Sequence, residues 1–153
     1  MRKLLFVLLG TLLLDQVSKF AVFLLMEPGE SVPLLSDFVR LTFVRNSGAA
    51  FGLLPGNRIP FLFTTFLAIA ALLFLLFRSR RTGAGISSYL VLVLAGATGN
   101  LIDRLRLGEV VDFIDIGWNK NVRWPVFNVA DAAVTVGVLL FLYRSLFGRR
   151  PAG

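Results

Sequence analysis

The sequence contains no cysteine and no histidine, and these two absences exclude most of the familiar catalytic devices. Without cysteine, the chain has no disulfide, no thiolate nucleophile and no thiolate metal ligand. Without histidine, it has no Ser-His-Asp or Cys-His catalysis, no His-ligated zinc and no histidine proton relay. We therefore expect no bound metal and no cofactor, and carboxylates are the most economical source of chemistry that remains.

Charged residues are also scarce, because they make up 16% of the 153 residues whereas 56% are hydrophobic. The mean hydropathy is +0.79. A soluble domain would be about one quarter charged. Since the apolar residues are concentrated in long runs, the composition indicates a membrane protein. The length favours one compact unit, so we predict a single integral membrane domain over residues 1–153.

Four apolar runs are long enough, or nearly so, to cross a hydrocarbon core about 30 Å thick. We predict spans at approximately residues 4–26, 61–77, 86–106 and 127–147, separated on the outer side by loops 27–60 and 107–126. The first run follows Arg2 and Lys3, which is also typical of a cleaved signal peptide. Asp15, Gln16 and Lys19 interrupt this run, and no small-residue cleavage site follows, so a retained span is favoured. Asp15 and Lys19 share a helix face at i, i+4 and can therefore pair.

Basic residues are distributed unevenly between the two sides that four spans would create. The side with both termini and the turn after the second span carries eight basic residues and no acid: Arg2, Lys3, Arg78, Arg80, Arg81, Arg144, Arg149 and Arg150. Short basic loops belong to the cytoplasm, so both termini are predicted to be cytoplasmic. The net charge of +7 then reflects membrane orientation, and we expect no nucleic-acid partner.

The first outer loop contains one predicted strand and one segment of small residues. Residues 38–44 alternate partly and are rich in β-branched and aromatic side chains, which favours a short strand. Residues 46–52 (NSGAAFG) follow. Small side chains there would allow close approach of the backbone to another strand or a ligand, or would simply form a turn.

Five of the nine carboxylates are concentrated between the third and fourth apolar runs: Asp103, Glu109, Asp112, Asp115 and Asp131. Carboxylates beside lipid are costly and indicate a functional site. Asn100, Asp103 and Arg104 share one helix face at i, i+3 and i+4. We predict that Asp103 is structural, through an ion pair with Arg104 or a bond to neighbouring backbone. Leu107 and Gly108 are predicted to end the helix.

Asp112 and Asp131 are the best candidates for chemistry. Asp112 lies among β-branched and aromatic residues, which would desolvate it and raise its pKa. If the loop 117–125 folds back, the two carboxyls can meet and share one proton, so that one activates water and the other protonates a carbonyl. Structural roles remain open. Asp112 could cap a helix or pair with Arg123, and Asp131 could lie at a helix N-terminus, where the helix dipole favours a carboxylate.

A different class of function also remains open from spacing alone. Acids within membrane spans mark ion and proton routes, so a small ion- or proton-translocating protein could use Asp15, Asp103 and Asp131. Such a protein would carry polar residues at mid-depth in several spans. Only the first run contains such a cluster, and the second contains none.

Five short blocks occur in order along the chain. They are Asp15-Gln16-x-x-Lys19, Asn46-x-Gly48-Ala49-Ala50-Phe51-Gly52, Gly99-Asn100-Leu101-Ile102-Asp103-Arg104, Val110-Val111-Asp112-Phe113 and Phe127-Asn128-x-Ala130-Asp131. Each block is weak alone, but all five across four predicted spans closely resemble the lipoprotein signal peptidase (signal peptidase II) family. One departure is Ala95, where the family usually has glycine, and we interpret it as a small change in helix packing.

The resemblance implies a fold and an activity. The fold is a four-transmembrane-helix bundle with an all-α membrane core, a small extracytoplasmic β-cradle and an outer crossover segment within 115–125. The activity is that of a membrane aspartic endopeptidase, which removes the signal peptide from diacylglyceryl-modified bacterial prolipoproteins just before the lipidated Cys. Trp118 and Trp124 would suit the membrane interface, or would pack against the cradle.

The resemblance also assigns roles to residues. Asp112 and Asp131 match the catalytic dyad, and Asp15 and Lys19 match a structural pair. Matched positions that line or support the site are Asn46, Gly99, Asn100, Arg104, Asn128 and Ala130, and we place Asp103 with them. Glu109 and Asp115 are left as loop residues. We expect lipidated prolipoproteins and membrane lipid as partners, a monomer, and a location in the bacterial inner membrane with the active site near the outer leaflet.

Overall fold

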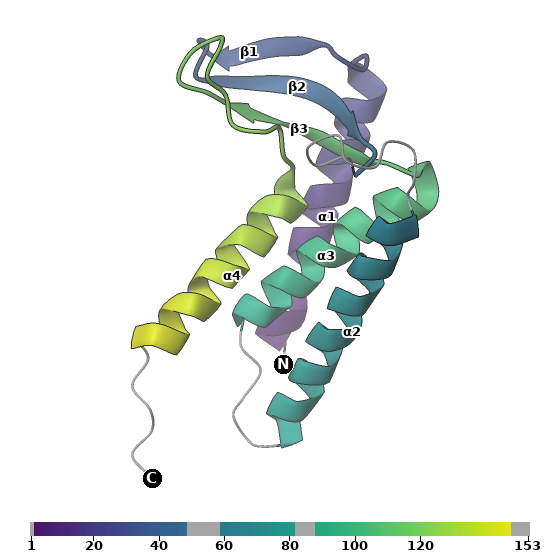
Figure 1. Cartoon of the computed structure of the whole chain (residues 1–153), viewed down its shortest axis with the longest axis vertical. Helices are drawn as coiled ribbons and strands as arrows, with labels where there is room; N and C mark the ends of the chain where they lie inside the picture. The colour runs from purple at the N-terminus through teal and green to yellow at the C-terminus, as the bar shows by residue number, and fades with distance from the viewer. Residues whose placement is uncertain (1, 49–58, 82–87, 148–153) are drawn as a thin grey trace.

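The computed structural model describes residues 2–48, 59–81 and 88–147 (Figure 1). Its elements in chain order are α1 (Arg2–Leu25), β1 (Ser31–Leu35), β2 (Val39–Asn46), α2 (Ile59–Arg81), α3 (Ser88–Leu107), β3 (Val110–Ile116) and α4 (Val129–Phe147). The predicted small-residue segment from residue 49 on, most of the basic turn after α2, and the arginines at 149 and 150 lie outside the described residues.

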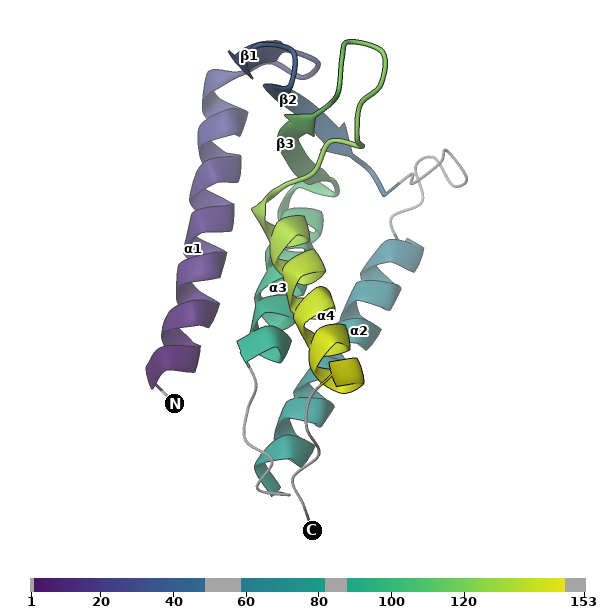
Figure 2. The ribbon, with the colours of Figure 1, turned by 90° about the vertical axis from the view of Figure 1, so that its left-hand side faces the viewer.

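The helices run alongside one another, and the strands form a sheet over one end of them. The start of α1 and the end of α4 lie at the opposite end (Figures 1 and 2). The helix α3 packs against each of the other three described helices, so it is the centre of the bundle. Its last turn is therefore positioned where the bundle meets the sheet.

Three of the described helices are long and apolar enough to cross a membrane: α1, α2 and α4. Large apolar side chains cover their outer surfaces, as expected for helices that contact lipid. The third predicted span is the helix α3, in which Asn100, Asp103 and Arg104 lower the apolar character of the outer half. The helical, membrane-type architecture is thus confirmed, whereas a count of four spans stays a prediction.

The described strands form one antiparallel sheet in the order β1-β2-β3. The predicted strand at 38–44 is confirmed as β2. The sequence did not predict β3, because its first four residues are all buried and it therefore lacks alternation of apolar and polar side chains. Gly108 connects α3 to β3 with φ +79°, and its N–H bonds to Arg104 O at 3.1 Å, which confirms the predicted helix end.

A small apolar core joins the sheet to α1. It consists of Val22 from α1, Phe43 from β2, and Val111 and Phe113 from β3. The ring of Phe23 meets that of Phe43 edge-on, with centroids 6.3 Å apart. This contact fixes the height of the sheet above the bundle and therefore the position of β3.

The segment between β3 and α4 folds back as a hairpin, which was the condition placed on residues 117–125 for the two carboxyls to meet. Trp118 N–H bonds to Val122 O at 2.9 Å, and Gly117 bridges to Arg123. The side chains of Trp118 and Trp124 are 84% and 70% exposed, so they do not pack against the sheet. The interfacial position remains the better interpretation of both.

Arg123 anchors this hairpin by bonding to Asp115 and Asp37, and not to Asp112, the partner considered from the sequence. Its Nε donates to Asp115 Oδ1 at 2.6 Å, and its Nη1 donates to Asp37 O at 2.6 Å. Thr42 donates its hydroxyl to Asp115 Oδ2 at 2.6 Å. Asp115 is therefore a buried strand residue that fixes the hairpin, so its interpretation as a loop residue is wrong, and so is a pairing of Arg123 with Asp112.

Gly99 allows α1 and α3 to approach closely. A methyl group at Gly99 would lie 2.5 Å from Asp15 Oδ2 and 3.4 Å from Ala130 Cβ. Such a contact is too short, and Asp15 is held in place because its Oδ1 accepts the N–H of Ala130 at 2.8 Å. Gly99 thus lets three helices meet at one point.

Gly99→Ala is expected to destabilise the chain by about 1–3 kcal/mol, because overpacking forces α1 away from α3 and α4. The thermal unfolding midpoint in detergent measures this loss. Gly10→Ala on α1 is the matched control, because nothing lies within 4 Å of the added methyl group. Equal midpoints for the two variants would contradict the close approach at Gly99.

Candidate active site

Asp112 and Asp131 come together through one residue, Asn128. Asp112 lies on β3 and is 2% exposed. Asp131 lies in the first turn of α4. The Asn128 side-chain amide donates to Asp112 Oδ1 at 2.6 Å, and its backbone N–H donates to Asp131 Oδ2 at 3.2 Å. The predicted meeting of the two carboxylates is therefore mediated by the residue that precedes α4.

Asn128 and Asp131 cap α4 reciprocally. Asn128 Oδ1 accepts the N–H of Asp131 at 2.9 Å, while Asp131 Oδ2 accepts the N–H of Asn128. This is a capping box, which satisfies N–H groups that the first turn leaves free. Asp131 thus takes the position at a helix N-terminus that was left open as a structural alternative, and its other carboxylate oxygen, Oδ1, remains for a second donor.

The strands β2 and β3 supply the second contact to Asp112. Their register pairs Val44 with Asp112, and Asn46 lies two residues further along β2. Asn46 Nδ2 donates to Asp112 Oδ2 at 2.9 Å, and its Oδ1 accepts the N–H of Gly48 at 2.9 Å. The bond from Gly48 fixes which end of the Asn46 amide faces the carboxylate.

Asn100 supplies the second contact to Asp131. Its Nδ2 donates to Asp131 Oδ1 at 2.7 Å, while its Oδ1 accepts from Lys19 Nζ at 2.8 Å and Asn128 Nδ2 at 3.1 Å. Because an ammonium group can only donate, Lys19 fixes the Asn100 amide with its NH₂ toward Asp131. Three asparagines thus present donors to all four oxygens of the two carboxylates.

A buried ion cluster contacts one of these asparagines, Asn100, through Lys19. Lys19 Nζ lies 3.0 Å from Asp15 Oδ2 and 3.0 Å from Asp103 Oδ2. Lys19, Asp15 and Asp103 are all at most 4% exposed. The predicted pairing of Asp15 with Lys19 is confirmed.

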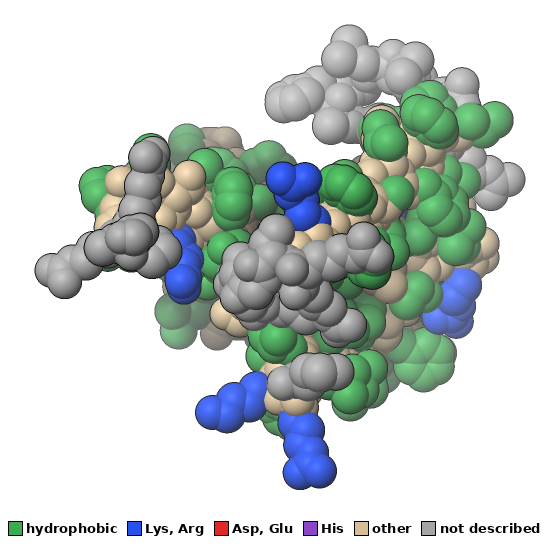
Figure 3. Space-filling model, turned by 90° about the horizontal axis from the view of Figure 1, so that it is seen from below, with side chains coloured by type: hydrophobic (Ala, Val, Ile, Leu, Met, Phe, Trp, Pro, Cys, Tyr) green, Lys and Arg blue, Asp and Glu red, His purple; other side chains and the backbone are tan. Residues whose placement is uncertain are grey.

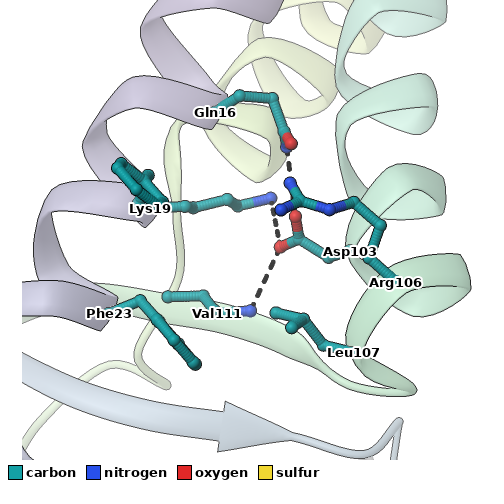
Figure 4. Close-up of a pocket in the computed structure, with 8 residues that line it drawn as sticks. Gln16, Lys19, Phe23, Asp103, Arg106, Leu107 and Val111 are labelled. Atoms are coloured by element: carbon teal, nitrogen blue, oxygen red, sulfur yellow. Dashed lines mark hydrogen bonds and ion pairs between the residues drawn. The ribbon is translucent and has the colours of Figure 1, made fainter.

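The predicted ion pair of Asp103 with Arg104 is wrong, because Asp103 lies on the side of α3 that faces α1 and pairs with Lys19 (Figure 4). The alternative that Asp103 bonds backbone is confirmed, since it accepts the N–H of Val111 at 3.2 Å. Arg104 is half-buried, and its Nη1 donates to Asn100 O at 3.4 Å. Its charge is attracted by Asp131, Asp112 and Asp103.

Gln16 is a contributor to which the sequence assigned no role. Its Nε2 donates to Asp103 Oδ1 at 3.1 Å, Asp15 Oδ2 at 3.1 Å and Gly99 O at 3.3 Å. The signal was its place between two charged residues in an apolar run. Ala130, which is fully buried, contributes the backbone N–H that bonds Asp15.

Burial raises the pKa of Asp112 to about 6, from an ordinary value of 3.8. The hydrogen bond from Asn46 opposes this rise, the nearby charge of Asp131 adds to it, and Asn128 and Lys19 oppose it. Asp112 therefore retains its proton in mildly acidic solution. Within residues 2–48, 59–81 and 88–147, no three acidic side chains converge in a way that would ligate a metal ion.

A buried carboxylate, Asp112, and a half-buried one, Asp131, are held by amide donors at the end of apolar helices, which is the arrangement expected of an aspartic hydrolase of the membrane. The comparisons with known proteins agree with this class. The family model described as signal peptidase II matches residues 7–147, so the chain belongs to the signal peptidase II family. This membership does not support the alternative of an ion- or proton-translocating protein.

Relatives and solved structures extend over nearly the whole chain. The lipoprotein signal peptidase of Halothermothrix orenii is 44% identical over 138 residues, covering 90% of this chain and 91% of the relative. That of Syntrophus aciditrophicus is 45% identical over 136 residues, covering 86% and 84%. A solved bacterial membrane enzyme superposes with a TM-score of 0.80 at 30% identity, covering 100% of this chain and 94% of that one.

Proposed function

We propose that Asp112 and Asp131 are the catalytic pair with which this aspartic endopeptidase removes signal peptides from prolipoproteins. The observation that carries the proposal is the set of amide donors from Asn46, Asn100 and Asn128 on both carboxylates. The structural carboxylates Asp15 and Asp103 both have a cation, Lys19, as a direct partner. Asp112 and Asp131 are instead held in fixed positions beside each other without neutralisation by a direct ion pair among the described residues.

The two carboxylates have different catalytic roles because their surroundings differ. Asp131 acts as the base, because Asp112 has the raised pKa and therefore supplies the proton. It takes a proton from water, whose oxygen bonds to the peptide carbonyl carbon, while Asp112 protonates the carbonyl oxygen. As the C–N bond breaks, the proton on Asp131 passes to the leaving nitrogen, and Asp112 takes back a proton from a hydroxyl group of the intermediate, so that the acid product forms and both residues return to their starting states.

The orientation in the membrane follows from charge. Figure 3 shows the end of the molecule where α1 begins and α4 ends, and the described side chains on that face include Lys and Arg but no Asp or Glu. The described basic residues near this end are Arg2, Lys3, Arg78 and Arg144. This end therefore faces the cytoplasm. The sheet and the dyad lie at the outer leaflet of the bacterial inner membrane, and α3 is counted as the fourth span.

The substrate enters laterally, with its signal helix and acyl chains still in hydrocarbon. The scissile bond, just before the diacylglyceryl-modified Cys, then reaches the carboxylates at the level of the outer leaflet. Asn46, Asn100 and Asn128 position the carboxylates and have further capacity to bond an extended backbone. One chain contains every residue assigned to the site, so a monomer suffices.

The test is incubation of the purified chain with a prolipoprotein in diacylglyceryl-modified and unmodified forms. Only the modified form is expected to be cut, on the N-terminal side of the lipidated Cys, as measured by mass spectrometry of both products. Equal cleavage of the two forms would contradict the assigned substrate, although it would leave the catalytic pair intact.

The rate is expected to depend on pH through Asp112. Because the pKa of Asp112 is about 6 and its proton is needed, kcat/KM falls as the pH rises through about 6. Asn46→Ala removes a bond that favours the ionised form, so this limb moves to higher pH. Initial rates between about pH 5 and 8 measure both effects. A flat profile, or a limb that Asn46→Ala leaves in place, would refute the role of Asp112 as the acid.

A further inference from the structure

A pocket lies between α1, α3 and the start of β3, apart from the two catalytic carboxylates (Figure 4). Its cavity holds about 70 Å³ and is partly open, so it is too small to enclose a whole ligand, which would lie mainly at the mouth. Neither Asp112, Asp131 nor any of the three asparagines lines it. The reaction therefore leaves this pocket unexplained.

The floor of the pocket is polar, but the donors of its ammonium group are all used within the protein. Lys19 Nζ already has three partners, at 3.0 Å from Asp15, 3.0 Å from Asp103 and 2.8 Å from Asn100. An ammonium group has three hydrogens, so Lys19 has none left for a ligand. Any charged ligand must be held at the mouth instead.

Two arginines border the mouth. Arg106, in the last turn of α3, is exposed and extends into the pocket from α3 (Figure 4). Arg45 on β2 is opposite Val111, which lines the pocket, and its guanidinium carbon lies 5.5 Å from the ring centroid of Phe23, another lining residue. Within the described part of the chain, neither guanidinium forms an ion pair with a carboxylate.

The remaining walls are apolar and continue onto an exposed surface. Phe20 and Leu107 line the pocket beside Phe23. Phe20 is 57% exposed, and Leu24, one turn further along α1, is 63% exposed. Cations above an apolar wall, near the sheet end of the helices, match a ligand with an anionic head and an apolar tail.

We propose that this pocket binds an anionic phospholipid of the outer leaflet, with its phosphodiester between Arg45 and Arg106 and an acyl chain along Phe20 and Leu24. The three cations around the pocket exceed the two buried carboxylates by one, which equals the negative charge of one phosphodiester. Arginine is suited to phosphate because its planar guanidinium donates two parallel hydrogen bonds. The proposal uses the same membrane orientation as the proposed function but none of the catalytic residues.

The test is native mass spectrometry of the purified full chain, titrated separately with phosphatidylglycerol and phosphatidylcholine. We expect tighter binding of phosphatidylglycerol. Arg45→Gln and Arg106→Gln should each weaken it about fivefold, and the double variant about thirtyfold, on the scale of basic residues near anionic lipid. Free glycerol phosphate should not displace the lipid, because it lacks the apolar part.

Two controls distinguish a specific lipid site from non-specific attraction between basic residues and anionic lipid. Lys120→Gln removes an exposed cation from the outer hairpin and should leave lipid binding unchanged. Asp112→Asn should bind phosphatidylglycerol as tightly as the parent even though it is inactive, so failure of the catalytic assignment would not affect this result. The proposal is overturned if the two lipids bind equally, if the double variant binds like the parent, or if Lys120→Gln weakens binding as much. Displacement by an acidic peptide rather than by lipid would also overturn it, because it would identify a protein segment as the occupant.

Discussion

Asp112→Asn and Asp131→Asn are each expected to lower the cleavage rate of a lipid-modified prolipoprotein by about 10³-fold or more. An amide cannot accept the proton of the attacking water at Asp131, and it cannot donate an acidic proton at Asp112. Asparagine keeps the size of the side chain and can still accept a bond from Asn100 or Asn128. The fold should therefore persist, and the loss should fall on kcat rather than on membrane insertion.

Asp37→Asn is the matched control for this prediction. Asp37 lies in the turn between β1 and β2, and its ion pair with Arg40 is partly exposed, so its loss should change the rate by less than about twofold. Thermal midpoints of all three variants in detergent show whether each remains folded. Cleavage near the parent rate by a folded Asp112→Asn or Asp131→Asn variant would make the catalytic assignment wrong.

Lys19→Met is expected to reduce the free energy of unfolding by about 3–5 kcal/mol, which is the usual cost of removing one partner from a buried ion pair. Lys19 faces two carboxylates, Asp15 and Asp103, and its loss leaves both buried without a cation. The orientation of the Asn100 amide is lost at the same time, so residual activity should fall as well. The thermal midpoint in detergent and the cleavage rate measure the two effects.

Two further variants give reference values for the destabilisation expected of Lys19→Met. Arg40→Met removes a partly exposed ion pair and should cost at most about 1 kcal/mol. Asp103→Asn should be milder than Lys19→Met, because Lys19 retains Asp15 as a partner. A Lys19→Met midpoint equal to that of Arg40→Met would contradict the buried cluster. A folded but inactive Asp103→Asn would show that Asp103 contributes to the chemistry rather than to stability alone.

The chain order and the residue types made much of the site predictable. Apolar runs identified three helices that can span a membrane, and the i, i+4 spacing of Asp15 and Lys19 identified their ion pair. The absence of histidine and cysteine directed attention to carboxylates. These signals come from local spacing or from composition, and one sequence is enough to show either of them.

The contacts that assemble the site are long-range and were not predictable in the same way. Asp103 pairs with Lys19, 84 positions away, although Arg104 is adjacent in sequence, because the helix turns Asp103 toward α1. The strand β3 escaped detection because both of its faces are buried. Asn128, rather than the hairpin itself, joins the two carboxylates. The position of Asn128 depends on the pairing of residue 127 with β3.

The most direct measurement is a single-turnover experiment with enzyme in excess over lipid-modified prolipoprotein, in which binding and cleavage are followed in the same sample. We predict that the parent chain binds and cuts the substrate, whereas Asp112→Asn and Asp131→Asn bind it and leave it uncut. A variant that binds more weakly but cuts its bound substrate at the parent rate would contradict the claim that these two carboxylates perform the chemistry.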